Sequence, residues 1–240
     1  MKPPIVLVHG AWGGAWVWRR VLAPLRAAGH EVHAVTLTGD GERAHLLSPA
    51  ITLRTHVDDV LGLVRAEELR GIVLVGHSYG GLVVTGAADA LLAEDPGLLR
   101  ALVYVDAVVP RSGEEWGTQH TPEVRAQRAA LAAAHGGALP PPDPEAFGLG
   151  GTDRDWLLRR HVPHPFGVYA DPLHFDEARW LEVPRTFIDC PAPALGTIAA
   201  FRQRVREQPG WRLREIATGH FPMVSTPATL VDMLLEAAAG

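Results

Sequence analysis

The sequence predicts an α/β fold, a mostly parallel, doubly wound sheet with helices on both faces. Three observations support this. Short runs of apolar residues, rich in Val, Ile and Leu, recur along the chain. The runs are continuous rather than alternating, which is typical of strands buried on both faces. Stretches with helical spacing of apolar residues separate them, and alternating strands and helices are the pattern of a parallel sheet.

Six strands and five helices are expected. The strands are Ile5–Val8, Val32–Leu37, Ile72–Val75, Leu102–Val105, Thr186–Ile188 and Leu213–Ala217. The helices are Val17–Ala28, Arg54–Arg65, Gly80–Leu92, Ile198–Glu207 and Ala228–Ala237. The sequence Ser-Thr-Pro before the last helix favours Thr226 as its N-cap and Pro227 as its first residue.

The alternation of strands and helices lapses between about residues 111 and 182. Thr121 and Pro122 begin an alanine-rich helix, a proline cluster follows at 140–144, and a second helix is expected from Asp153. This stretch is small for an independent core. We therefore expect one domain over 1–240, with a helical cap inserted at about 111–182 above the carboxyl edge of the sheet. The aromatic residues of the insertion either line a pocket or form its own core: Trp116, Trp156, Phe166, Tyr169 and Trp180.

Composition excludes several chemistries. The 240 residues include 22 basic and 27 acidic ones, and a net charge of −5 does not favour nucleic acid or anionic membrane as a partner. Lys2 is the single lysine, so Schiff-base and Walker A chemistry lack a positioned amine. Cys190 is the single cysteine, which excludes an internal disulfide and a cysteine-built zinc site. Without a secretory or membrane-spanning apolar run, a cytoplasmic location is expected, and homodimerisation stays open.

A serine motif carries the clearest functional signal. The segment Gly76-His77-Ser78-Tyr79-Gly80 lies between an expected strand and an expected helix, and G-x-S-x-G in that position is a nucleophile elbow. Its glycines are needed because the serine occupies a tight turn, where larger side chains would collide with the neighbouring strand and helix. The turn exposes the Ser78 hydroxyl and directs the N–H of Tyr79 toward a developing oxyanion.

A glycine-rich loop follows the first strand. Its sequence, His9-Gly10-Ala11-Trp12-Gly13-Gly14, could cradle a phosphate, but it lacks the GxGxxG pattern, and the only lysine precedes the strand. Acyl transfer needs two N–H groups that converge on one oxygen. We therefore expect the N–H of Ala11 to be the second oxyanion donor, opposite Tyr79, and Trp12 to contact substrate.

Among the twelve histidines, His220 is the best candidate for a catalytic base. It follows the last expected strand, from where it can reach back over the sheet edge to the serine. His77 is expected to point away from the site, and His9 to support the glycine-rich loop. His161 and His164 have only loose metal-ligand spacing with a proline between them, so no metal site is predicted. Most of the other histidines are expected at the surface.

These residues resemble the α/β-hydrolase superfamily, and within it the plant methylesterase and hydroxynitrile-lyase group with its bacterial esterase relatives. The resemblance covers nearly the whole chain outside the insertion. The matching segments are VLVHGAWGGAWVWRRVLAPLRAAGHEVHAVTL, VDDVLGLV, IVLVGHSYGGLV, ALVYVDAVVP, GWRLREIATGHFPM and STPATL. The resemblance implies an α/β-hydrolase fold with a small helical cap, Ser78 as nucleophile, His220 as base, Ala11 and Tyr79 as oxyanion donors, and no cofactor.

The sequence departs from this family at the acid of the triad. In the plant enzymes an aspartate follows a late strand, and the corresponding stretch here, 188–194, has alanine or proline at that position. Asp106 ends the strand after the nucleophile's strand and is the favoured acid, because its position matters more than its order along the chain. Asp189 is the alternative. A Ser-His dyad stays open, as does a turn-capping role for Asp106.

A second departure separates lyase from esterase. Hydroxynitrile lyases of this group carry a threonine in the oxyanion loop and a lysine after the catalytic histidine, where this sequence has Gly10 and Phe221. That lysine stabilises the leaving cyanide, whereas ester hydrolysis needs no such cation. The sequence favours a serine carboxylesterase that cleaves a small-molecule ester, with methyl esters among the candidates, through an acyl-enzyme. The alternatives are a cofactor-free lyase, cyclase or oxygenase that uses the histidine base, or a hydrolase-fold ligand-binding protein.

Overall fold

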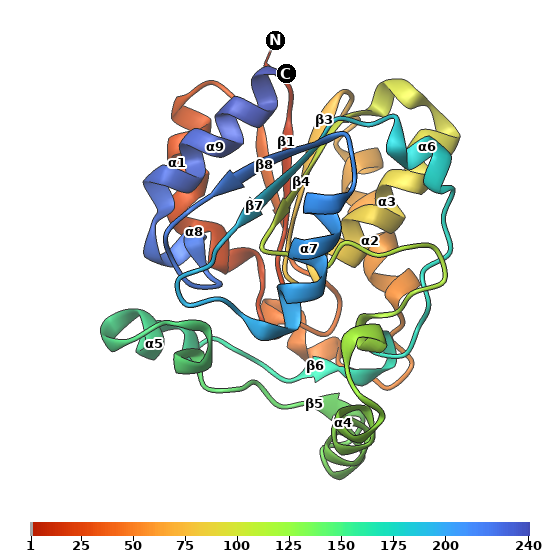
Figure 1. Ribbon diagram of the computed structural model, residues 1–240, viewed down its shortest axis with the longest axis vertical. Helices are drawn as coiled ribbons and strands as arrows, with labels where there is room; N and C mark the ends of the chain where they lie inside the picture. Colours follow the sequence, from red (N-terminus) through yellow and green to blue (C-terminus); the bar gives the residue numbers. More distant parts are fainter. Residues whose placement is uncertain (1) are drawn as a thin grey trace.

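The computed structural model describes residues 2–240 and contains the expected parallel sheet (Figure 1). Its strand order is β2-β1-β3-β4-β7-β8, and every neighbouring pair is parallel. The strands are β1 Ile5–Val8, β2 Val32–Val35, β3 Ile72–His77, β4 Leu99–Val105, β7 Arg185–Asp189 and β8 Trp211–Glu215. The α/β fold class predicted from the sequence is confirmed.

Helices cover both faces of this sheet (Figure 1). On one face lie α1 (Arg19–Ala27), α8 (Pro222–Ser225) and α9 (Pro227–Ala239). On the other lie α2 (Leu53–Ala66), α3 (Gly80–Glu94) and α7 (Ala199–Glu207). In β1, Ile5 and Leu7 join the first of these two cores, and Val6 and Val8 join the second. Both sides of the strand are buried, which is why its apolar run is continuous.

The interior strands β3, β4 and β7 are longer than expected, whereas at the two edges of the sheet the strands end early or are shifted along the chain. Strand β2 ends two residues early, at Val35, and β8 spans 211–215 instead of 213–217. Both are edge strands. Several side chains of β8 are partly or fully exposed, whereas the buried Ile216 comes after its end. At an edge, the apolar run therefore does not mark where pairing begins and ends.

The two threonines expected to cap helices behave differently. Thr121 accepts a hydrogen bond from the N–H of Val124 and begins α4 (Pro122–Ala134), as expected. Thr226 precedes α9, but its side chain does not cap that helix. Its hydroxyl donates instead to the Pro222 carbonyl at 3.4 Å, and its backbone N–H donates to the same carbonyl at 3.0 Å, so Thr226 closes the C-terminus of α8.

Between β4 and β7 the chain leaves the sheet. Helix α4, helix α5 (Gly151–Leu158) and the short antiparallel strands β5 (Ala138–Leu139) and β6 (His164–Pro165) lie beyond the carboxyl ends of the sheet strands (Figure 1). Helix α6 (Glu177–Leu181) returns to the sheet and packs beside α3, where Trp180 is part of the core. The inserted segment thus covers the edge at which β3 and β4 end. Within residues 2–240, no helix is long and apolar enough to cross a membrane.

Candidate active site

Ser78 lies at the turn between β3 and α3, with a backbone φ of 53°. A Cβ atom at Gly76 would lie 2.6 Å from the carbonyl oxygen of Gly80, and one at Gly80 would lie 2.7 Å from the carbonyl oxygen of His9. Neither separation can be tolerated without moving the backbone. The left-handed conformation of Ser78 is therefore held by close packing of two glycines, which is the physical content of the G-x-S-x-G motif.

The loop after β1 lies directly against this serine. A Cβ atom at Gly10 would lie 2.8 Å from the Cβ of Ser78. Ala11 comes next and is buried. Within residues 2–240, neither the N–H of Ala11 nor that of Tyr79 donates a hydrogen bond. Trp12 has a φ of 65°, and its Nε1–H donates to the carbonyl of β5 residue Leu139 at 3.0 Å, which ties the loop to the inserted segment.

His9 supports this loop, as the sequence predicts. Its Nδ1–H donates to the Gly10 carbonyl at 2.6 Å, and its Nε2 accepts the N–H of Leu37 at 3.1 Å. Burial is the main cause that lowers the pKa of His9. A neutral imidazole is the form that can donate at one nitrogen and accept at the other, so both bonds are satisfied together.

His220 lies on the loop between β8 and α8, and its Nδ1 is 2.7 Å from Oδ2 of Asp106. Both side chains are buried. Donation from Nδ1–H to the carboxylate leaves Nε2 of His220 as an acceptor. Asp106 directly follows β4 with a φ of 42°, and its N–H donates to the Ile188 carbonyl at 2.8 Å. The structure thus brings Asp106, the aspartate that the sequence favours, to the histidine.

Asp189, the alternative acid, has different partners. Its Oδ1 accepts from Nε of Arg202 at 2.5 Å, and its Oδ2 accepts from Nη2 of Arg206 at 2.5 Å. Nη2 of Arg202 also donates to Oδ1 of Asp106 at 2.6 Å. One buried guanidinium therefore bridges the two aspartates, and its charge compensates the burial of both carboxylates.

His77 has a role that the sequence did not predict, because it contacts the loop that carries His220. Its Nε2–H donates to the backbone carbonyl of His220 at 2.7 Å, and the two ring centroids are 4.6 Å apart. Burial is the main cause that lowers the pKa of His77 well below its usual value. The neutral ring therefore supports the loop of His220 from behind. The sequence carried no signal for this contact, which joins β3 to the loop after β8.

A buried polar cluster lies behind Tyr79. The hydroxyl of Tyr79 is 2.9 Å from Nδ1 of His56, and Nδ1 of His164 is 2.9 Å from both carboxylate oxygens of Asp40. The rings of Tyr79 and His164 pack with centroids 4.9 Å apart. The expectation that most remaining histidines are exposed is wrong for His56, which lies on the buried face of α2, and for His30, which is also buried.

We expect the free energy of unfolding to fall as the pH drops from about 6.5 to about 4. Burial lowers the pKa of both His56 and His161 to about 4. The unfolded chain titrates these residues near 6.5, so it binds more protons in this range, and each histidine adds up to about 1.4 kcal/mol per pH unit. The contributions of Asp40 and His164 to this pH dependence offset each other. Burial raises the pKa of Asp40 to about 7 and lowers that of His164 to about 3, so unfolding releases one proton and takes up another.

Urea unfolding between about pH 7 and about pH 5 measures this slope. A His56→Gln variant keeps a donor and an acceptor but does not titrate. The gap in unfolding free energy between the parent protein and this variant should therefore shrink as the pH falls. Parallel curves for the two proteins would contradict the assigned role of His56.

A cavity of about 200 Å³ lies between the sheet edge and the inserted segment. Ser78 and His220 line it from the sheet, and Trp12, Trp116 and Phe147 supply aromatic walls. Among the described residues that line it, none is acidic. Trp116 is the one of the five expected cap aromatics that lines the cavity, and Phe147, which also lies in the inserted segment, lines it without having been predicted. The other four expected aromatics pack elsewhere, as in Trp156 against Trp16: Trp156, Phe166, Tyr169 and Trp180.

The loosely spaced histidine pair has no shared contacts. His161 packs against Trp16 and Phe221, whereas Nδ1 of His164 is occupied by Asp40. The two imidazole rings thus pack in different parts of the structure.

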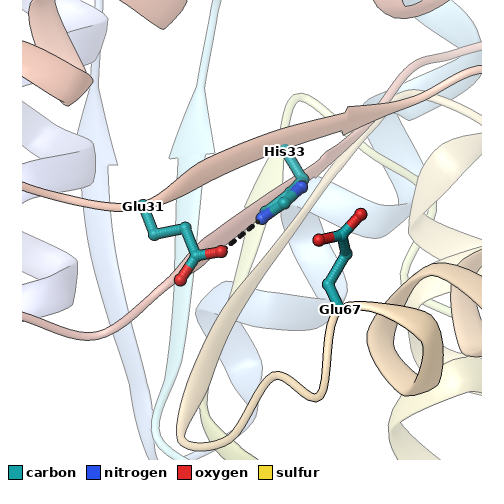
Figure 2. Close-up of side chains that lie close together, drawn as sticks. All are labelled: Glu31, His33 and Glu67. Atoms are coloured by element: carbon teal, nitrogen blue, oxygen red, sulfur yellow. Dashed lines mark hydrogen bonds and ion pairs between the residues drawn. The ribbon is translucent and has the colours of Figure 1, made fainter.

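One other group gathers potential metal ligands. Glu31, His33 and Glu67 hold ligand atoms within 4.8 Å of one another, and Nε2 of His33 is 2.9 Å from Oε1 of Glu31 (Figure 2). Both glutamates are exposed. The group lies at the amino end of β2, opposite the sheet edge that carries Ser78. We assign it no part in the chemistry at the serine.

Comparison with known proteins agrees with this geometry. Residues 5–233 match the model of the alpha/beta hydrolase family. The chain is 40% identical over 238 residues to the carbendazim hydrolyzing esterase of Nocardioides sp. (strain SG-4G), covering 95% of this chain and 97% of that protein. It is 29% identical over 254 residues to methylesterase 7 of Arabidopsis thaliana, covering 97% and 95% of the two chains.

Solved structures of other proteins have the same fold as this chain. An extracellular alpha/beta-hydrolase from a Paenibacillus species, described as sharing structural and functional homology with tobacco salicylic acid binding protein 2, superposes with a TM-score of 0.84. Sequence identity is 20%, and 98% of each chain is covered. The resemblance to the methylesterase-like group and its bacterial esterase relatives is confirmed, and the chain belongs to the alpha/beta hydrolase family.

Proposed function

We propose that this protein is a serine carboxylesterase that hydrolyses a small-molecule ester through Ser78, His220 and Asp106. One observation carries the proposal. Nδ1 of His220 is hydrogen-bonded to Asp106, and the same histidine lines one cavity together with Ser78, whose backbone is in the left-handed conformation of the elbow. This is the arrangement that acyl transfer requires, because the acid fixes the tautomer of the base and the base faces the nucleophile. The esterase and methylesterase names of the relatives support the same class of reaction.

The first half of the proposed reaction forms an acyl-enzyme. Nε2 of His220 takes the proton of the Ser78 hydroxyl as Oγ bonds to the ester carbonyl carbon. The N–H groups of Ala11 and Tyr79 stabilise the resulting oxyanion. When the tetrahedral intermediate collapses, the bond to the alcohol oxygen breaks, and the alcohol leaves with the proton from Nε2.

The second half releases the acid. Nε2 of His220 takes a proton from water, whose oxygen bonds to the acyl carbon, and the bond to Oγ of Ser78 then breaks. Ser78 recovers its proton from the imidazolium. The steps use only protein groups and water. Asp106 stays ionised throughout and stabilises the imidazolium.

The inserted segment is proposed to act as a cap that sets substrate shape. Trp12 and Trp116 lie edge to face with centroids 6.0 Å apart, and both line the cavity with Phe147. A cavity of about 200 Å³ walled by aromatic side chains suits a compact acyl or alcohol group. This size and lining support a small-molecule ester as the substrate class.

Replacement of the nucleophile tests the proposal. We expect Ser78→Ala to lower kcat for 4-nitrophenyl hexanoate by about 10⁴-fold or more, because the covalent route is lost while the binding groups stay. Mass spectrometry should find a phosphonate ester probe attached to the peptide that contains Ser78. A Ser48→Ala variant is the matched control, since that hydroxyl accepts a hydrogen bond from Ala50 in a loop outside the cavity.

Two results would count against the proposal. Turnover that survives in Ser78→Ala would indicate base chemistry by His220 without a covalent step, as in a lyase, cyclase or oxygenase. Tight ligand binding without turnover in the parent protein would indicate a binding protein.

A further inference from the structure

One cationic side chain lines the cavity, and it comes from the inserted segment. Arg128 lies on α4 and contributes to the cavity wall. Arg125, nearly one turn earlier on the same helix, forms an ion pair with Glu115. Among residues 2–240, no carboxylate lies within ion-pair distance of Arg128. The position after His220, where related lyases carry a lysine, holds Phe221, and this cation comes from α4 instead.

Aromatic rings hold the guanidinium of Arg128 in place. Its Cζ lies 5.5 Å from the ring centroid of Tyr169 and 5.9 Å from that of Trp116. Tyr169 is in turn held by a hydrogen bond of 2.8 Å between its hydroxyl and Nδ1 of His120. Ring contacts occupy the face of a guanidinium, whereas its N–H donors lie in the plane and stay available for an acceptor.

The surroundings of Arg128 favour an anion. Among the described residues that line the cavity, none is acidic, and the polar ones other than Arg128 are Ser78, Gln119, His120, Thr197 and His220. Arg125, on the same helix, is already paired with Glu115, which precedes α4. A partly buried guanidinium with free N–H donors gains most from a carboxylate, which it can bind through two parallel hydrogen bonds.

We propose that Arg128 forms a carboxylate-binding subsite, so that the preferred substrates are esters carrying a carboxylate away from the scissile bond. This rests on the proposed esterase function and narrows its substrate class. The carboxylate sits on the acyl side, as in half-esters of dicarboxylic acids, or on the alcohol side, as in esters of hydroxy acids. In both kinds of ester the group that Arg128 would bind is a carboxylate.

Matched substrate pairs test the subsite. The acyl-side pair is mono(4-nitrophenyl) adipate against 4-nitrophenyl hexanoate, which have the same chain length and leaving group. The alcohol-side pair is 4-carboxyphenyl hexanoate against phenyl hexanoate. The readout is the ratio of kcat/KM for the anionic ester to that for the neutral ester. In at least one pair, Arg128→Met should lower this ratio by about 10- to 100-fold, the usual worth of a charge-assisted hydrogen bond.

Three further variants distinguish binding of the substrate carboxylate by Arg128 from an effect of the substitution on the stability of α4. Arg128→Glu should reverse the preference, because it places a like charge against the substrate carboxylate. Arg128→Lys should keep part of the preference, since an ammonium retains the charge but lacks the planar fork. Arg125→Met is the matched control on the same helix, and it should leave the ratio unchanged.

The two hypotheses fail in different ways. If neither the anionic nor the neutral esters are hydrolysed in a Ser78-dependent manner, the proposed esterase function fails. The subsite is then judged by calorimetry of Ser78→Ala with monomethyl adipate against methyl hexanoate, where Arg128→Met should remove the tighter binding of the anion. If hydrolysis is Ser78-dependent but the anionic-to-neutral ratio is the same in the parent protein and in Arg128→Met for both pairs, the subsite is refuted alone.

Discussion

Replacing Asp106 by Asn should lower kcat for ester hydrolysis by about 10⁴-fold with little change in KM. The amide keeps the size of the side chain but presents an NH₂ group or a neutral oxygen to Nδ1 of His220, which in the parent protein donates a hydrogen bond of 2.7 Å to Oδ2 of the Asp106 carboxylate. The ring is then no longer fixed in the tautomer that leaves Nε2 as an acceptor, and the imidazolium loses its counter-charge. Steady-state kinetics on 4-nitrophenyl hexanoate measures the change.

Asp189→Asn is the matched control for this prediction. It lies at the end of the neighbouring strand β7 and shares Arg202 with Asp106. Because it reaches His220 only through that guanidinium, we expect kcat to fall by less than about tenfold. The reverse order, a large loss at Asp189 and a small one at Asp106, would refute the assignment of the triad acid.

The sequence was most informative where a local rule fixes the backbone. The apolar runs of β1 and β3 are buried on both faces, so hydrophobicity alone predicted both ends of β1 and the start of β3, which continues beyond the run to His77. The elbow followed from Gly76 and Gly80, whose positions leave no room for a Cβ atom. Asp106 could be favoured because carboxyl ends of neighbouring parallel strands meet at one edge of the sheet.

The sequence does not predict contacts that side chains make only through tertiary packing. Arg202 lies in α7, yet its guanidinium reaches the ends of β4 and β7. Nothing in the pattern of α7 distinguishes this arginine from Arg204 or Arg206, which lie on the same helix. Arg128 is similar, because its place in the cavity depends on how α4 packs beside β5 within the inserted segment. Charge counts cannot identify either residue.

Removing the Arg202 guanidinium should lower the free energy of unfolding by about 3–5 kcal/mol, the usual cost of breaking a buried ion pair. Arg202→Met keeps an apolar stem but leaves Asp106 and Asp189 buried with less compensation, since both now accept hydrogen bonds from this side chain. Urea unfolding measures the loss. Arg206→Met is the control on the same helix, because that guanidinium is 52% exposed and its pair with Asp189 should be worth less than about 1 kcal/mol.

The same variant distinguishes a structural role from a positioning role. If Arg202 orients the Asp106 carboxylate toward His220, Arg202→Met should lower kcat and leave KM nearly unchanged, since Arg202 is not among the residues that line the cavity. In an Asp106→Asn background the same replacement should then cost little further activity, because the two residues act as one unit. Arg202→Lys should restore only part of kcat, as an ammonium cannot bridge two carboxylates with the fixed fork of a guanidinium. Additive losses in the double variant would show that Arg202 stabilises the fold without orienting the acid.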